Sequence, residues 1–197
     1  MKQILIIFLS CISLVACENS PQVIIDNQTL IGKYHGNTEI ASFLGVPFAE
    51  PPISDLRWSA PLAFIPKNSM KQATDFAPAC MQDMSILEWY RDLAAVFGNN
   101  RNVVDDLNTS EDCLYLNIWT PTTDKKANLP VMVYIHGGGN NSGWSFEPNY
   151  HGYALAQKDV VVVSIAYRLR VFGLISQSEK ENEDAIANFG LWDQIAA

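Results

Sequence analysis

Two runs of consecutive apolar residues, rich in β-branched side chains, constrain the fold of this 197-residue chain more than any other feature. Residues 131–135 read Val-Met-Val-Tyr-Ile, and residues 160–165 read Val-Val-Val-Val-Ser-Ile. Runs of this kind are typical of strands that are buried on both faces of a parallel sheet. The intervening residues 149–158 are predicted to form a crossover helix, and such strand–helix–strand units close with a right-handed crossover. The sequence therefore predicts an α/β fold.

The first of these runs is followed at once by His136 and three glycines, residues 137–139. A buried strand that ends in glycines presents backbone N–H groups at the edge of a sheet, with no side chains to obstruct them. Two such amides can stabilise the negative oxygen that develops during acyl transfer. We therefore predict an oxyanion hole here. These residues alone leave open the alternative of a flexible glycine-rich surface loop.

The residues before this unit predict a small antiparallel β region, a loop and a helix. Short apolar runs separated by turn-forming residues indicate antiparallel strands. These runs are residues 23–25, 29–32 and 40–44. Residues 47–66 contain five prolines and are predicted to form an ordered loop. Apolar residues at helical spacing predict one helix over 85–97, ended by Gly98, and a last helix over roughly 184–197.

The N-terminal residues predict export to the cell envelope. Lys2 precedes an apolar stretch that is too short to span a bilayer as a helix, so residues 1–16 are predicted to be a signal peptide. The stretch ends in Leu-Val-Ala-Cys, which resembles the bacterial lipobox. We therefore expect lipidation of Cys17, a tether over residues 17–22 and a membrane anchor in the lipid. The alternative is an ordinary signal peptide with a chance cysteine, and either interpretation exports the protein.

Composition makes nucleic acid an unlikely partner. The formal net charge is −8, and no cluster of Lys or Arg occurs anywhere in the chain. Binding to phosphates depends on concentrated cationic side chains, which this sequence lacks. No group of His, Cys, Asp or Glu has the spacing of metal ligands. We therefore expect no nucleic acid, no metal and no other cofactor.

Five sequence blocks occur in a fixed order along the chain. They are residues 43–52 (Phe-Leu-Gly-Val-Pro-Phe-Ala-Glu-Pro-Pro) with 56–58 (Leu-Arg-Trp), 110–117 (Ser-Glu-Asp-Cys-Leu-Tyr-Leu-Asn), 130–139, 161–169 (Val-Val-Val-Ser-Ile-Ala-Tyr-Arg-Leu) and 188–194 (Asn-Phe-Gly-Leu-Trp-Asp-Gln). In this order they resemble the type-B carboxylesterase/cholinesterase family of α/β-hydrolases. The resemblance covers residues 23–197, which it identifies as the N-terminal portion of that domain. It implies a mixed, mostly parallel sheet with crossover helices, preceded by the small antiparallel β region.

The resemblance also implies roles for individual residues. The amides of Gly138 and Gly139 match the family's oxyanion donors, while His136 shapes the loop and is not the catalytic base. In an exported chain Cys80 and Cys113 can pair or remain buried free thiols, and the resemblance implies the disulfide. It further implies two structural ion pairs. These pairs are Arg57 with Glu111, and Arg168 with Asp193.

The sequence departs from the family's pattern near the glycines. Asn140 and Asn141 stand where many members have apolar or aromatic residues. Ala166 replaces a common Asn, and Arg170 replaces a common Gly. These changes concern the shape and polarity of the pocket mouth and leave the fold assignment intact.

The resemblance implies hydrolysis of small-molecule carboxylic esters by serine acyl transfer. The 197 residues contain no Gly-x-Ser-x-Gly nucleophile elbow. The nearest segment, residues 143–147, fails at its fifth position and follows no predicted strand, so Ser145 is not the nucleophile. We therefore expect no catalytic serine, acid or base in these residues, and no ester turnover by this fragment alone. The alternatives are a non-catalytic binding or adhesion member of the family, and a truncated product that does not fold stably. The sequence does not indicate an oligomeric state.

Overall fold

The computed structural model describes residues 20–103, 105–175 and 187–197. Its centre is a five-stranded sheet in the order β3-β4-β8-β10-β9. The strands are β3 (Lys33–Tyr34), β4 (Ala41–Pro47), β8 (Tyr115–Thr120), β10 (Val161–Ile165) and β9 (Val131–Ile135). The predicted signal peptide and Cys17 lie outside the described residues. Within the described part of the chain, no helix has the length and apolarity needed to cross a membrane.

A smaller sheet packs on one face of this central sheet. It has the order β1-β2-β5. Its strands are β1 (Gln22–Ile25), β2 (Gln28–Ile31) and β5 (Met70–Gln72). Antiparallel pairing of β1 with β2 confirms the strands expected at 23–25 and 29–32, and β3 pairs antiparallel with β4 across residues 35–40. Leu30, Ala41 and Phe43 are buried in one cluster between the two sheets.

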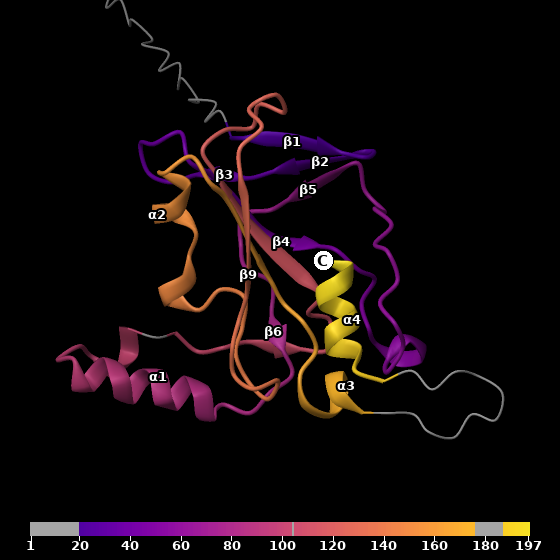
Figure 1. Cartoon of the computed structure of the whole chain (residues 1–197), viewed down its shortest axis with the longest axis vertical. Coiled ribbons are helices and arrows are strands. Elements are labelled where there is room, and N and C mark those ends of the chain that lie inside the picture. The colour runs from indigo at the N-terminus through magenta and orange to yellow at the C-terminus, as the bar shows by residue number, and fades with distance from the viewer. Residues whose placement is uncertain (1–19, 104, 176–186) are drawn as a thin grey trace, which may run out of the picture.

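The helices are short and lie at the margins of the sheets. They are α1 (Ser85–Val96), α2 (Tyr153–Ala156), α3 (Arg170–Leu174) and α4 (Phe189–Ala196), with 3-10 turns η1 (Ser54–Leu56), η2 (Arg101–Val103) and η3 (Pro148–Tyr150). A third sheet has two strands, β6 (Ala79–Cys80) and β7 (Thr109–Ser110). Figure 1 shows β6 near α1, and Ala79 of β6 is buried in one cluster with Leu87 of that helix. The helix predicted over 85–97 is confirmed. Of the helix predicted over roughly 184–197, residues 184–186 lie outside the described residues, and Phe189–Ala196 form α4.

The predicted strand–helix–strand unit forms, with a shorter helix than expected. Strands β9 and β10 pair in parallel, as the two apolar runs predict. Between them, the helix expected over residues 149–158 is reduced to η3 and the single turn of α2. Gly152 begins that turn so close to the sheet that an added Cβ would lie 2.6 Å from Val162 and 2.8 Å from Trp119. The start of α2 therefore lies directly against the sheet.

The expectation of a mostly parallel sheet does not hold within the described residues. In the central sheet β3–β4, β4–β8 and β8–β10 are antiparallel, and only β9–β10 is parallel. The sheet is mixed, as expected, and the fold is of the α/β class. The pair β3–β4 is antiparallel because six residues join the two strands, too few for a parallel crossover.

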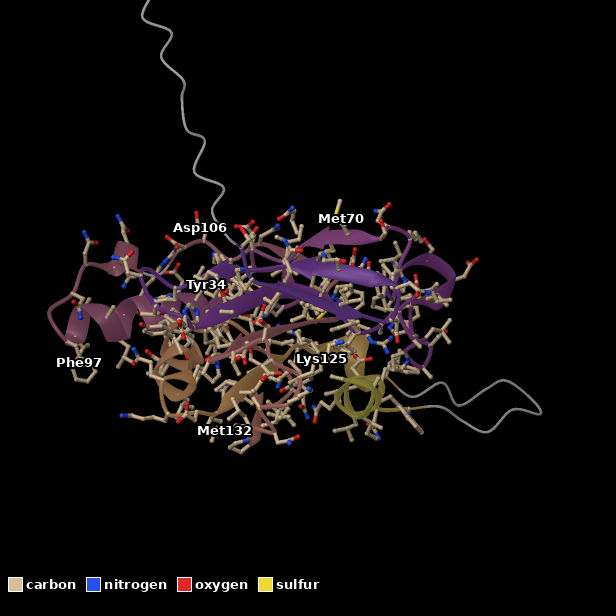
Figure 2. The ribbon with its side chains drawn as sticks, turned by 90° about the horizontal axis from the view of Figure 1, so that it is seen from above. Tyr34, Met70, Phe97, Asp106, Lys125 and Met132 are labelled. Atoms are coloured by element: carbon tan, nitrogen blue, oxygen red, sulfur yellow. A yellow bond between two sulfur atoms is a disulfide. The ribbon has the colours of Figure 1, made fainter. Side chains whose placement is uncertain are left out.

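The position of β9 corrects a second expectation. Val131, Val133 and Ile135 are 61, 56 and 47% exposed, whereas the apolar run predicts burial on both faces. Met132, which alternates with them, is 46% exposed. Figure 2 shows Met132 on the opposite side of the molecule from Met70 of β5. Strand β9 lies at the edge of the described sheet and has a neighbouring strand, β10, along one edge only. Strand β10 lies between β8 and β9 and is largely buried.

Candidate active site

The segment that begins with His136 leaves the carboxyl end of β9, where sites of α/β sheets form. His136 is buried, and its ring stacks on Tyr167 with centroids 4.3 Å apart. The Tyr167 hydroxyl donates a hydrogen bond of 2.7 Å to the carbonyl oxygen of His136. Burial lowers the pKa of His136 to about 4, so the ring is neutral near pH 7. This residue is a support for the loop, as expected, and not an exposed proton carrier.

The three glycines that follow are exposed. Gly138 has φ +107°, and an added Cβ would lie 1.9 Å from the carbonyl oxygen of Ser142, so only glycine fits this position. Gly139 has φ +61° and opens onto free space, since an added Cβ would meet nothing within 4 Å. Among the described residues, neither the Gly138 nor the Gly139 N–H has a hydrogen-bond acceptor. Two exposed amides are therefore available to a ligand.

The loop closes on itself and onto α3. The N–H groups of Asn141 and Ser142 donate to the carbonyl oxygen of Gly138, at 3.1 and 3.3 Å. The Asn141 side chain donates to the carbonyl of Gly139 at 3.1 Å. The N–H of Arg170, the first residue of α3, donates to the carbonyl of Asn140 at 2.8 Å. Of the two asparagines that depart from the family's pattern, Asn141 uses its side chain within the loop, and Asn140 accepts from α3 through its backbone carbonyl.

The two candidate disulfide cysteines are joined. Cys80 and Cys113 form a disulfide across 33 residues, with Cα atoms 5.0 Å apart. Both are buried in the cluster that includes Leu114, Tyr167 and Leu169. This is the pairing that the resemblance implies, and free thiols are excluded in this structure. The bond ties β6 to the start of β8, beneath the connection that carries Tyr167.

The two expected ion pairs are also present, and they differ in burial. Arg57 donates from Nη2 to Glu111 Oε1 at 2.7 Å, with side chains 40 and 24% exposed. Hydrogen bonding to Glu111 raises the pKa of Arg57. Arg168 and Asp193 are 4 and 0% exposed and are joined by Nη2 to Oδ1 at 2.7 Å. Arg57, Glu111 and Arg168 line one small hollow beside the disulfide.

Comparison with known proteins identifies the family. The sequence pattern of the carboxylesterase family matches residues 19–197. The chain belongs to the carboxylesterase family. It is 42% identical over 193 residues to carboxylesterase 1F of Mus musculus, covering 93% of this chain and 33% of that protein. It is 39% identical over 162 residues to fumonisin B1 esterase of Sphingopyxis macrogoltabida, covering 81% and 27%.

Solved esterase structures agree with this assignment. A PNB esterase superimposes with a TM-score of 0.74 at 33% identity, covering 89% of this chain and 33% of that one. A carboxylesterase of Geobacillus stearothermophilus gives a TM-score of 0.70 at 32% identity, over 89% and 33%. The fold is therefore that of an α/β-hydrolase. The chain spans about one third of the length of the relatives it matches.

A buried polar network in this carboxylesterase chain carries no obvious sequence signal. The Asn117 side chain accepts a hydrogen bond from the N–H of Gly45 at 3.0 Å and donates to Ser145 Oγ at 3.1 Å and Ser164 Oγ at 3.3 Å. Ser145 is 4% exposed and lies within this network. Its hydroxyl is therefore out of reach of a substrate, as expected for a serine outside a nucleophile elbow. Asn117 lies in one of the five blocks, yet its position alone does not reveal its partners.

A buried carboxylate holds the segment that follows the glycines. Glu147 is 5% exposed, and its Oε1 accepts the N–H of Trp144 at 3.2 Å. Its Oε2 accepts a hydrogen bond from the Tyr90 hydroxyl of α1. Desolvation, together with this bond to Glu147, raises the pKa of Tyr90. The sequence signal for this link between α1 and the loop is a glutamate that stands among aromatic residues.

The acidic and histidine side chains do not assemble a metal site within the part of the chain that the structure describes. No group of three or more His, Cys, Asp or Glu residues is close enough there to hold an ion.

Proposed function

We propose that this chain supplies the oxyanion site of an enzyme that hydrolyses small-molecule carboxylic esters by serine acyl transfer. The observation that carries the proposal is the pair of exposed amides of Gly138 and Gly139, which have no acceptor among the described residues. Membership of the carboxylesterase family supports the class of reaction. A pure scaffold has no need for an open loop of donors, which favours catalysis over a binding role.

The loop acts on the charge that develops during attack on the ester. When a serine oxygen adds to the carbonyl carbon, the carbonyl oxygen becomes an oxyanion that needs donors about 3 Å away. Gly138 and Gly139 offer two N–H groups fixed in place before the reaction, so little reorganisation is required. Removal of one donor of this kind lowers kcat by about 10²–10³ in other enzymes.

The nucleophile, its base and its acid do not belong to the glycine loop. Ser145 is buried and bonded to Asn117, and His136 is buried against Tyr167. We therefore expect the 197 residues alone to show no ester turnover. We expect the complete gene product to hydrolyse p-nitrophenyl butyrate. That hydrolysis should stop on treatment with a serine-reactive phosphonate.

Two matched glycines test the role of the loop. Gly139 and Gly36 have φ of +61° and +57°, and an added Cβ would meet nothing within 4 Å at either. An alanine at either position has a similar backbone cost of about 1–2 kcal/mol. Alanine keeps the N–H of Gly139, but a shift of the backbone away from its positive φ would turn this N–H away from the oxyanion. We therefore expect Gly139→Ala to lower kcat by about 10²-fold and Gly36→Ala to leave it unchanged. Equal effects of the two substitutions, or no hydrolysis by the wild-type protein, would contradict the proposal.

We also propose that the protein is exported and anchored by a lipid on Cys17. The apolar N-terminal stretch before a lipobox-like Leu-Val-Ala-Cys supports this, and the Cys80–Cys113 disulfide fits an oxidising compartment. Metabolic labelling with an alkyne fatty acid should label the wild-type protein in the membrane fraction and not the Cys17→Ser variant. An exported but unlabelled wild-type protein would instead indicate an ordinary signal peptide.

A further inference from the structure

The loop over residues 137–143 has a backbone shape that local preferences do not fix. Gly138, Gly139, Asn140 and Gly143 have φ of +107°, +61°, +58° and +110°. Because glycine adopts positive and negative φ about equally readily, contacts with the surrounding structure must hold this loop in one shape. The loop's own bonds to the carbonyl of Gly138 close a turn at its centre and leave its ends to be fixed from elsewhere.

The side chain of Gln82 fixes the far end of this loop. Its Oε1 accepts the N–H of Gly143 at 2.8 Å, and its Nε2 donates to the carbonyl of the same residue at 2.8 Å. Gly143 is buried, so its backbone groups need partners within the protein. One side-chain amide therefore satisfies both groups, much as a neighbouring strand would.

Gly143 in turn presses against the start of the loop. An added Cβ would lie 2.4 Å from Nδ1 of His136 and 2.5 Å from the carbonyl oxygen of Gly137. The backbone of Gly143 therefore lies directly over the two residues that precede the oxyanion donors. Any movement of Gly143 releases the surface against which Gly137 is held.

Gln82 is itself rigidly held. Its Nε2 also donates to the carbonyl of Cys80 at 3.2 Å, and Cys80 is buried and bonded to Cys113. The next residue, Asp83, pairs with the side chain of Arg170. Since the N–H of Arg170 donates to Asn140 at 2.8 Å, the segment 80–83 supports the loop at a second point.

We propose that Gln82 is a positioning residue for the oxyanion donors: it clamps Gly143 against His136 and Gly137, and so fixes where the amides of Gly138 and Gly139 point. The proposal rests on the ester hydrolysis proposed above. An oxyanion donor acts only within hydrogen-bond distance of the developing anion, and a displacement of about 1 Å can lower a rate by about 10²-fold.

Three substitutions in the gene-encoded protein test this role. Gln82→Met keeps the length of the side chain and removes both bonds to Gly143. Gln82→Glu keeps an acceptor for the N–H of Gly143 but directs a second acceptor at its carbonyl. Gln157→Met is the matched control, because Gln157 is exposed at the end of α2 and bonds the Tyr153 hydroxyl at 3.0 Å.

The measurements separate positioning from general damage. They are kcat and KM for p-nitrophenyl butyrate, the affinity for a trifluoromethyl ketone whose adduct carries the oxyanion, and amide hydrogen exchange over residues 137–143. We expect Gln82→Met to lower kcat by about 10–100-fold with KM little changed, and to weaken the ketone in parallel. Exchange at Gly143 should accelerate. Gln82→Glu should fall between wild type and Gln82→Met, and Gln157→Met should behave as wild type.

Several outcomes would overturn the proposal. They are a kcat for Gln82→Met within twofold of wild type, an equal loss in Gln157→Met, and unaltered exchange over residues 137–143. If Gln82→Met does not fold, the same criteria apply to Gln82→Glu. If the wild-type protein hydrolyses no ester, the proposed function fails, and exchange alone decides whether Gln82 holds the loop.

Discussion

Replacement of Asp193 by asparagine should destabilise the protein strongly. Asp193 is completely buried in α4 and accepts three hydrogen bonds from Arg168. The backbone N–H and Nε donate to Oδ2 at 2.9 and 2.8 Å, and Nη2 donates to Oδ1 at 2.7 Å. Among the described residues, these groups of Arg168 have one other acceptor, the carbonyl of Ser59 at 2.9 Å from Nη2. The aspartate therefore supplies nearly all the compensation for a buried cation.

The magnitude follows from what asparagine can replace. Its single carbonyl oxygen can accept the N–H and Nε of Arg168, but its amide nitrogen then faces Nη2 donor to donor. Nη1 of Arg168 is buried and already has no hydrogen-bond partner among the described residues. Breaking a buried ion pair by removing one partner costs about 3–5 kcal/mol. For a chain of this size, that corresponds to a fall in Tm of roughly 6–20 °C.

The assay is urea unfolding followed by tryptophan fluorescence, with Glu111→Gln as the matched control. Glu111 carries the same kind of pair with Arg57, but that pair is far more exposed and its charges stay in contact with water. We expect the Glu111→Gln midpoint to stay close to wild type. A loss below about 1 kcal/mol in Asp193→Asn, or an equal loss in the control, would refute the reasoning from burial.

Further predictions concern the loop support, the disulfide and the sheet. Because burial lowers the pKa of His136 to about 4, the unfolded state takes up the proton first as pH falls. The free energy of unfolding should therefore fall by up to about 3 kcal/mol as the pH drops from 6.5 to 4. The urea midpoint of His136→Gln should fall less than that of the wild-type protein over the same pH range. Replacing both Cys80 and Cys113 with serine opens a 33-residue loop and should cost about 3–4 kcal/mol, whereas a reductant should then have no further effect on the urea midpoint. Gly152→Ala forces a Cβ against Val162 and should lower stability by about 1–3 kcal/mol by thermal melting, a result that an unchanged Tm would contradict.

Local signals in the sequence gave correct predictions where one segment decides its own structure. The helix α1 (Ser85–Val96) follows the apolar spacing and ends just before Gly98. The first hairpin turns between the apolar runs 23–25 and 29–32, as predicted, with Asp26 at φ +51°. The glycine loop was also predictable from one continuous segment, because residues 137–139 directly follow the apolar run of β9.

Features that depend on distant partners were not predictable in the same way. The apolar run of β9 identifies a strand, but its exposure depends on which elements lie beside it. The same holds for the antiparallel pairing of β8 with both β4 and β10. The bond between Gln82 and Gly143 joins residues 61 positions apart. A side-chain amide that pairs with backbone groups leaves no periodic mark, so only the folded structure identifies it.

The buried ion pair and the glycine loop share one short segment. Asp193 holds the N–H of Arg168, and two residues later the N–H of Arg170 holds the carbonyl of Asn140. The carbonyl of Arg168 also lies where a Cβ on Gly173 or Gly190 would collide, at 2.1 and 2.5 Å, so α3 and α4 pack directly against it. The tethers from α4 and from Gln82 therefore reach the loop from two separate elements. Loss of Asp193 should thus loosen Asn140 before the protein unfolds, and faster amide exchange near that residue would reveal the connection.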